Sequence, residues 1–152
     1  MSMADSFRHF FCSNFTIMSV NDPIIVFDGV CGLCSRAVSF IIKRDPEKKF
    51  KFIAAQSQHL SRYVTDEDCL KKIKSNETIV LITAEACFYK TDAAFMVLKQ
   101  LNSPLRKLHF LLHIPKFIRD GIYAHVAKRR YKWFGRYNQC MVPDPSIMDR
   151  FL

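Results

Sequence analysis

An apolar run that leads directly into two closely spaced cysteines constrains this chain more than any other feature. Residues 24–27 (IIVF) are typical of a short buried strand, and the turn after them begins at Asp28. Cys31 and Cys34 follow in C-x-x-C spacing, at the start of a helix predicted over residues 33–44. A helix N-terminus stabilises negative charge, and the thiolate is the nucleophilic form of cysteine. The pattern therefore predicts a strand–turn–helix unit that carries a reactive dithiol.

The remaining elements predict an α/β fold with one small mixed sheet. They comprise strands at 50–54, 78–83 and 86–90, one or two short helices within 57–74, a helix from an N-cap at Thr91 to Leu101, a helix that starts at Pro104, and a basic amphipathic helix over 116–130 after Pro115. A strand–helix–strand start implies a parallel pair with a right-handed crossover, and the later hairpin adds antiparallel strands. This order matches a thioredoxin-like α/β sandwich with a helical C-terminal extension.

The length and composition suit one domain with a sizeable core. The chain has 152 residues, and 49% of them are hydrophobic. We expect a single domain over residues 22–152, preceded by an N-terminal extension over residues 1–21 that is open to disorder. No window approaches the roughly 18–20 continuous apolar residues of a membrane span. We therefore expect a soluble cytoplasmic protein whose cysteines are mostly reduced, with organelle targeting by residues 1–20 as the open alternative.

The formal net charge of +9 is concentrated in residues 99–136, where ten basic residues accompany one acidic residue, Asp120. Ile118, Ile122 and Val126 recur every four residues there and give the predicted helix an apolar face. One interpretation is that this positive region binds an anionic partner. The other is that it is a basic helix face that is simply exposed to solvent. Both interpretations stay open from the sequence.

Three aromatic residues lie beside these cations near the end of the chain. Trp133, Phe134 and Tyr137 could stack nucleic-acid bases, but no recognised nucleic-acid-binding motif accompanies them. We therefore expect no nucleic-acid partner. Instead, we expect the aromatic cluster to anchor the C-terminal segment on the core.

Three separated motifs resemble a known family. They are PIIVFDGVCGLCSRAVSFIIKRD at 23–45, YKTDAAFMVLKQL at 89–101 and KRRYKWFGRYNQCMVP at 128–143. Together they resemble the DCC family of thiol-disulfide oxidoreductases, which is named for an Asp-x-x-Cys-x-x-Cys motif, here Asp28, Cys31 and Cys34. The resemblance covers roughly residues 22–152 and implies a thioredoxin-like fold and a redox activity.

A dithiol of this kind suggests a role for each motif residue. We expect Cys31 to be the attacking thiol, because it is nearer the helix end and should be the more exposed cysteine. Cys34 would be the resolving thiol. Asp28 would either accept the proton of Cys34 as a general base or cap the turn. The substrate would be a protein or small molecule with a disulfide, an external thiol would be the reductant, and no bound cofactor is expected.

The competing hypothesis is a non-catalytic basic binding module in which C-x-x-C is a redox sensor or a zinc ligand pair. Zinc would need two further ligands, and His109 and His113 stand too far along the chain for the spacing of a zinc finger. Cys12, Cys69 and Cys87 have no motif context and are expected to be passive. Cys140 is either a buried small hydrophobe or a third redox partner.

Overall fold

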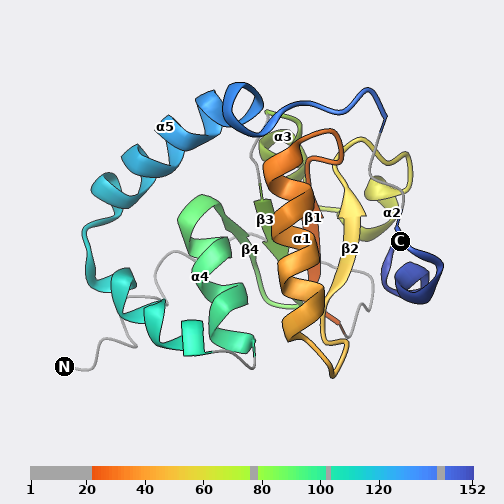
Figure 1. Cartoon of the computed structure of the whole chain (residues 1–152), viewed down its shortest axis with the longest axis horizontal. Helices are drawn as coiled ribbons and strands as arrows, with labels where there is room; N and C mark the ends of the chain where they lie inside the picture. Colours follow the sequence, from red (N-terminus) through yellow and green to blue (C-terminus); the bar gives the residue numbers. More distant parts are fainter. Residues whose placement is uncertain (1–21, 76–78, 102–103, 140–142) are drawn as a thin grey trace.

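A computed structural model describes residues 22–75, 79–101, 104–139 and 143–152. Its sheet has four strands in the order β2-β1-β3-β4 (Figure 1). The strands are β1 (Ile24–Phe27), β2 (Lys51–Ala54), β3 (Ile79–Ile82) and β4 (Cys87–Tyr89). β1 pairs parallel with β2 and antiparallel with β3, and β3 pairs antiparallel with β4. The predicted small mixed sheet is therefore confirmed.

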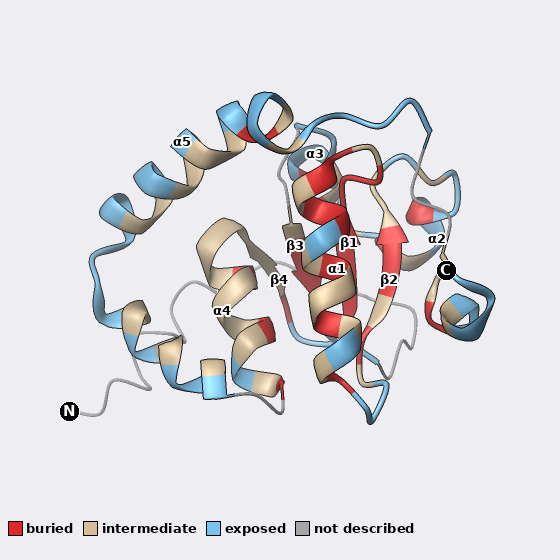
Figure 2. Cartoon of the chain, in the orientation of Figure 1, coloured by how far each residue is buried: buried red, intermediate tan, exposed pale blue. Residues whose placement is uncertain are grey.

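Helices cover both faces of this sheet. α1 (Gly32–Arg44) and α4 (Lys90–Gln100) enclose one core, whereas α2 (Leu60–Tyr63) and α3 (Glu67–Lys74) enclose the other. Alternate β1 residues point into each core, so all four are buried, and buried residues are concentrated in the central strands and the inner side of α1 (Figure 2). A strand covered on both faces loses its alternating pattern, which explains the continuous IIVF run. The architecture is a thioredoxin-like α/β sandwich.

The start of α4 differs from the prediction. The helix begins at Lys90 after Tyr89, and no side chain caps it. Thr91 therefore does not serve as the N-cap. Its hydroxyl instead donates to Asp120 Oδ1 at 2.8 Å and accepts from Arg119 Nη1. The polar side chain that suggested a cap is used to hold the C-terminal extension against α4.

That extension consists of the 3₁₀ helix η2 (Pro104–His113), the long helix α5 (Lys116–Phe134) and the 3₁₀ helix η3 (Pro145–Arg150). α5 contacts α4 near its start and α1 near its end (Figure 1). The predicted apolar spacing does not face the core, because Ile118 and Ile122 are 43% and 64% exposed. No helix in the described part of the chain is long and apolar enough to cross a bilayer.

The aromatic cluster also departs from its expected role. Trp133 and Tyr137 are both about half exposed, so they do not anchor the C-terminal segment. The final residues are held instead by Arg150, which is buried and pairs with the buried Asp45, and by Phe151, whose ring stacks on Phe52 at 5.5 Å.

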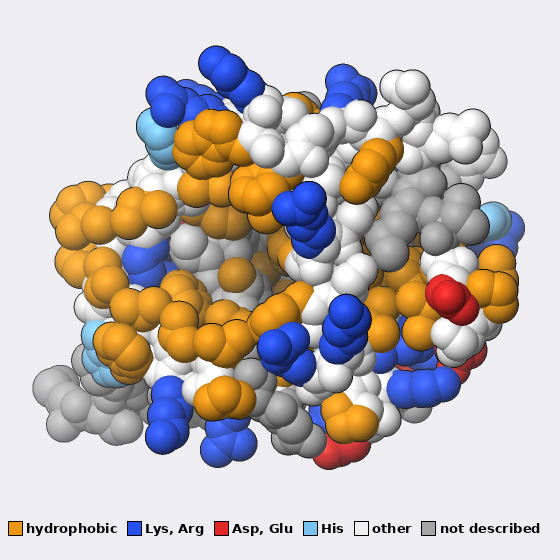
Figure 3. Space-filling model, in the orientation of Figure 1, with side chains coloured by type: hydrophobic (Ala, Val, Ile, Leu, Met, Phe, Trp, Pro, Cys, Tyr) orange, Lys and Arg blue, Asp and Glu red, His pale blue; other side chains and the backbone are white. Residues whose placement is uncertain are grey.

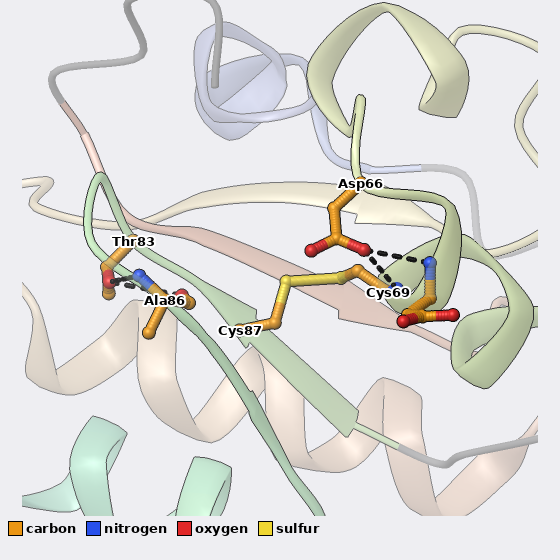
Figure 4. The surroundings of a disulfide bond; sticks show 6 residues. Asp66, Cys69, Thr83, Ala86 and Cys87 are labelled. Atoms are coloured by element: carbon orange, nitrogen blue, oxygen red, sulfur yellow. Dashed lines mark hydrogen bonds between the residues drawn. A yellow bond between two sulfur atoms is a disulfide. The ribbon is translucent and has the colours of Figure 1, made fainter. Parts of the chain in front are cut away.

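A disulfide crosses the second core. It joins Cys69 of α3 to Cys87 of β4 (Figure 4). The Asp66 carboxylate caps α3 by accepting from the backbone amides of Asp68 and Cys69, which fixes the position of Cys69. The expectation that Cys69 and Cys87 are passive thiols is therefore wrong. The two positions are 18 residues apart, and neither lies in a motif that would reveal the pairing.

Candidate active site

The dithiol lies where β1 passes into α1. The backbone amide of Cys31 donates to the carbonyl of Asp28 at 3.2 Å and closes the turn. Cys31 is then the N-cap residue of α1, and Cys34 lies in the first helical turn. The Cys34 side chain is hydrogen-bonded to Cys31, and both side chains are thiols. The two sulfurs are thus held in contact on the core side of the helix.

Both cysteines are buried, with 0% of Cys31 and 1% of Cys34 exposed. The expectation that Cys31 would be the exposed thiol is wrong because a distant segment covers it. We call residues 135–139, which follow α5, the strap. The Gly135 carbonyl accepts from the Gly32 amide at 3.2 Å, the Tyr137 amide donates to the Val30 carbonyl at 2.8 Å, and Arg136 forms a β-bridge with Cys31.

Gly32, the first of the two residues between the cysteines, permits this close approach. A Cβ atom on Gly32 would lie 2.2 Å from the backbone oxygen of Phe134, far inside van der Waals contact. Only glycine therefore allows the end of α5 to rest on the first turn of α1 in the observed position.

A buried polar network lies beneath the dithiol. Asp28 Oδ1 accepts from the Val30 amide at 3.1 Å and from Gln56 Nε2 at 2.8 Å. Asp28 Oδ2 accepts from Arg130 Nη2 at 3.0 Å and from the Tyr131 hydroxyl. Asp28 is 4% exposed and Arg130 is 3% exposed, so this ion pair is buried. The contact with Val30 confirms that Asp28 caps the turn.

Sequence reasoning missed Arg130 and Tyr131 as members of the site. In the sequence Arg130 is one of ten cations in residues 99–136, yet only 3% of its surface is exposed in the structure. A signal was present, because both residues lie in the third motif, KRRYKWFGRYNQCMVP. Their distance of about one hundred residues from Asp28 hid the contact itself.

The surroundings shift the pKa of two acidic groups in opposite directions. Burial favours the neutral form of Asp28, but hydrogen bonds from Tyr131 and Gln56 and the charge of Arg130 outweigh it, so its pKa lies below the ordinary 3.8. For Cys34, burial, followed by the charge and hydrogen bond of Cys31, raises the pKa well above its usual range. The Arg130 charge works in the other direction and lowers the pKa of Cys34. Cys34 therefore keeps its proton at neutral pH.

Of the other residues considered for a site, only the side chain of His113 lies within the described part of the structure, and it does not join this dithiol. His113 Nδ1 lies 2.9 Å from the Phe110 carbonyl, and the side chain of His109 is outside the described part of the structure, as are Cys12 and Cys140. Among the described residues, no three His, Cys, Asp or Glu side chains form a group that could hold a metal ion.

Known proteins resemble this chain across the same region. The family model for DCC1-like thiol-disulfide oxidoreductase matches residues 25–136. The chain is 40% identical to the uncharacterized protein YuxK of Bacillus subtilis over 141 residues. This alignment covers 90% of this chain and 98% of YuxK. It is also 32% identical over 119 residues to a DCC family protein of Arabidopsis thaliana that is named as chloroplastic. This second alignment covers 78% of this chain and 68% of the plant protein. No solved structure matches significantly.

Proposed function

This chain belongs to the DCC1-like thiol-disulfide oxidoreductase family, and on that premise we propose that Cys31 and Cys34 exchange a dithiol for a disulfide. The observation that carries the proposal is the contact between two thiols at the N-terminus of α1. The Cys31 thiolate attacks a substrate disulfide, forms a mixed disulfide and releases one substrate thiolate, which takes up a proton. Cys34 then loses its proton, attacks Cys31 and releases the second substrate thiol. Two electrons pass to the substrate, and an external thiol restores the dithiol without a bound cofactor.

Within this proposal, Asp28 is a positioning residue rather than a general base. Its carboxylate already accepts four hydrogen bonds, and its pKa is lowered, so it is a poor acceptor for the Cys34 proton. It holds Arg130 instead, and the positive charge of Arg130 favours the thiolate of Cys34. Asp28 therefore assists the resolving step through Arg130.

We also propose that residues 22–152 act as one domain. A cytoplasmic location stays a prediction. The Cys69–Cys87 disulfide is more typical of an oxidising compartment.

The exchange proposal is tested by a redox titration. The purified protein is equilibrated across a glutathione series, its thiols are alkylated, and Cys31 and Cys34 are quantified by peptide mass spectrometry. We expect a reversible two-electron transition in this pair, because the two thiols are already in contact. Cys31→Ser should abolish turnover of a disulfide substrate, and Cys34→Ser should accumulate a mixed disulfide on Cys31.

The matched control is the double variant Cys69→Ser/Cys87→Ser, which removes the other disulfide and should leave the transition in place. A pair that never oxidises, or that stoichiometric zinc protects from alkylation, would contradict the proposal and favour the binding-module alternative.

The outer face of α5 supports a second candidate function, which is docking on an anionic membrane. Phe117 is 77% exposed, and Phe110, Ile114, Ile118 and Ile122 are exposed around it. Hydrophobic side chains gather over η2 and the start of α5 at the left of Figure 3, with Lys and Arg side chains above and below them. Exposed apolar side chains flanked by cations are typical of helices that lie in the membrane interface. The charge of the 99–136 region selects an anionic surface.

Vesicle flotation tests this candidate. We expect the protein to bind phosphatidylglycerol vesicles at least about tenfold more tightly than phosphatidylcholine vesicles, since each cation near an anionic surface contributes roughly 1 kcal/mol. Phe117→Ser/Ile122→Ser should weaken binding, whereas Leu70→Ser, a partly buried apolar residue on α3, should not. Equal binding to both vesicles would contradict the idea, as would a dimer that the α5 variant dissociates.

A further inference from the structure

An open groove of about 970 Å³ runs along the outward side of α1 next to the strap. Its lining comes from six residues of α1 and three consecutive residues of the strap: Ser35, Arg36, Ser39, Phe40, Lys43, Arg44, Tyr137, Asn138 and Gln139. Lys and Arg side chains project over α1 near the centre of Figure 3. Small-molecule sites have volumes of roughly 300–1,000 Å³, so the groove has the size for a ligand such as a short peptide.

The lining of this groove is positive and uncompensated. Arg36, Lys43 and Arg44 contribute three cations, and no acidic residue lines it. Arg44 lies over the Phe40 ring at 3.9 Å and Arg36 over the Phe134 ring at 5.8 Å. Within the described residues, none of the three cations forms an ion pair with a carboxylate. A concave site with this charge favours an anionic ligand.

A buried hydroxyl at one end of the groove also lacks a partner. Ser35 is 8% exposed, and its Oγ has no hydrogen-bond partner in the described structure. Buried polar groups are normally satisfied, so an orphaned hydroxyl in a groove wall indicates a position for a ligand atom. Ser35 directly follows Cys34, and Tyr137 directly follows Arg136, which forms the bridge with Cys31. The groove is therefore lined by the residue that follows Cys34 and by the strap that bridges Cys31, whereas the two buried sulfurs lie behind this lining.

We propose that this groove binds a small thiol or disulfide that carries carboxylates, of the glutathione type, as the reaction partner of Cys31 and Cys34; this inference rests on the proposed exchange function. The three cations bind the carboxylates, and the amides of Asn138 and Gln139 bind the peptide groups. When the strap shifts and uncovers the dithiol, the Cys31 thiolate forms a bond to one sulfur of glutathione disulfide and releases one glutathione thiolate. Cys34 loses its proton and displaces the second glutathione. The products are a Cys31–Cys34 disulfide and, after proton uptake, two glutathione thiols.

The test compares two triple variants with the same change in charge. Arg36→Gln/Lys43→Gln/Arg44→Gln removes the groove cations, whereas Arg62→Gln/Lys71→Gln/Lys74→Gln removes exposed cations on α2 and α3. Binding is measured with S-methylglutathione, which cannot undergo exchange. Turnover is measured with glutathione disulfide and with the uncharged bis(2-hydroxyethyl) disulfide. Circular dichroism verifies that both variants fold.

We expect the groove variant to raise the Kd for S-methylglutathione and the KM for glutathione disulfide by at least about tenfold, since charge-assisted bonds are lost. The control variant should change neither, and neither variant should change the KM for the uncharged disulfide. Equal effects of the two variants would overturn the inference, as would wild-type protein that does not bind S-methylglutathione at millimolar concentration. Protein that binds S-methylglutathione but turns over neither disulfide would contradict the exchange function itself and leave the groove as a binding site without that role.

Discussion

Replacing Arg130 with methionine is expected to lower the free energy of unfolding by about 3–5 kcal/mol, the usual cost of removing one partner from a buried ion pair. Asp28 and Arg130 are both almost fully buried, and their side chains meet at 3.0 Å. Methionine preserves most of the side-chain length but leaves the Asp28 carboxylate buried without its cation. Urea unfolding at neutral pH measures the change.

A double-mutant cycle separates the ion pair from general packing. Asp28→Asn removes the charge but keeps an oxygen that can accept from the Val30 amide. The variant Asp28→Asn/Arg130→Met should be less destabilised than the sum of the two single variants, because neither charge is then buried alone. Additive losses would contradict the proposed coupling. A positive coupling energy would show that Arg130 stabilises the fold by neutralising the buried charge of Asp28.

The same variants test how Arg130 acts on the dithiol. Its charge lowers the pKa of Cys34, so in Arg130→Met the alkylation of Cys34 should require a higher pH than in the wild type. A general loss of stability would not produce this directional shift. If Asp28→Asn exchanges disulfides at the wild-type rate despite lower stability, a general-base role for Asp28 is contradicted.

Acid should remove the contribution of Asp28. Its pKa is lowered in the folded protein, so its stabilising effect is fully present above the ordinary value of 3.8 and is lost as the pH falls through the lower, folded-state value. The stability difference between the wild type and Asp28→Asn should therefore narrow in strong acid.

Local pattern predicted most of the fold because the main elements have local causes. The IIVF run forms β1 with the predicted ends, and the helix predicted over residues 33–44 is α1, which begins one residue earlier at Gly32. The parallel pairing of β1 with β2 followed from the strand–helix–strand order. The strand and the helix depend on residues that are close in sequence, and the parallel pairing depends on the order of consecutive elements.

The parts that the sequence did not predict depend on contacts between distant residues. Cys31 is buried by Arg136, more than one hundred residues along the chain, and no periodicity reports that contact. Cys69 and Cys87 meet only after α3 and β4 pack together. The apolar residues of α5 do recur every four residues, as predicted. Spacing alone does not determine whether that face packs on the core or is exposed to solvent, and Ile122 is exposed.

Replacing Gly32 with alanine is expected to uncover the dithiol. The added Cβ would lie 2.2 Å from the backbone oxygen of Phe134, and a backbone atom cannot move aside as a flexible side chain can. The strap must shift, which breaks the hydrogen bonds from Gly32 to Gly135 and from Tyr137 to Val30. Each backbone hydrogen bond contributes about 0.5–1.5 kcal/mol, so strap opening should become roughly 5- to 150-fold more favourable.

We therefore expect Cys31 and Cys34 in Gly32→Ala to react with iodoacetamide under native conditions at least about tenfold faster than in the wild type, by opening without global unfolding. Gly121→Ala is the matched control, because at that exposed position on α5 no described residue beyond its own helical turn lies within 4 Å of the added Cβ. The control should leave the alkylation rate unchanged. Urea unfolding of both variants distinguishes local opening from a general loss of stability. An unchanged rate in Gly32→Ala would mean that the strap does not control access, and the substrate would then have to reach the sulfurs by another route.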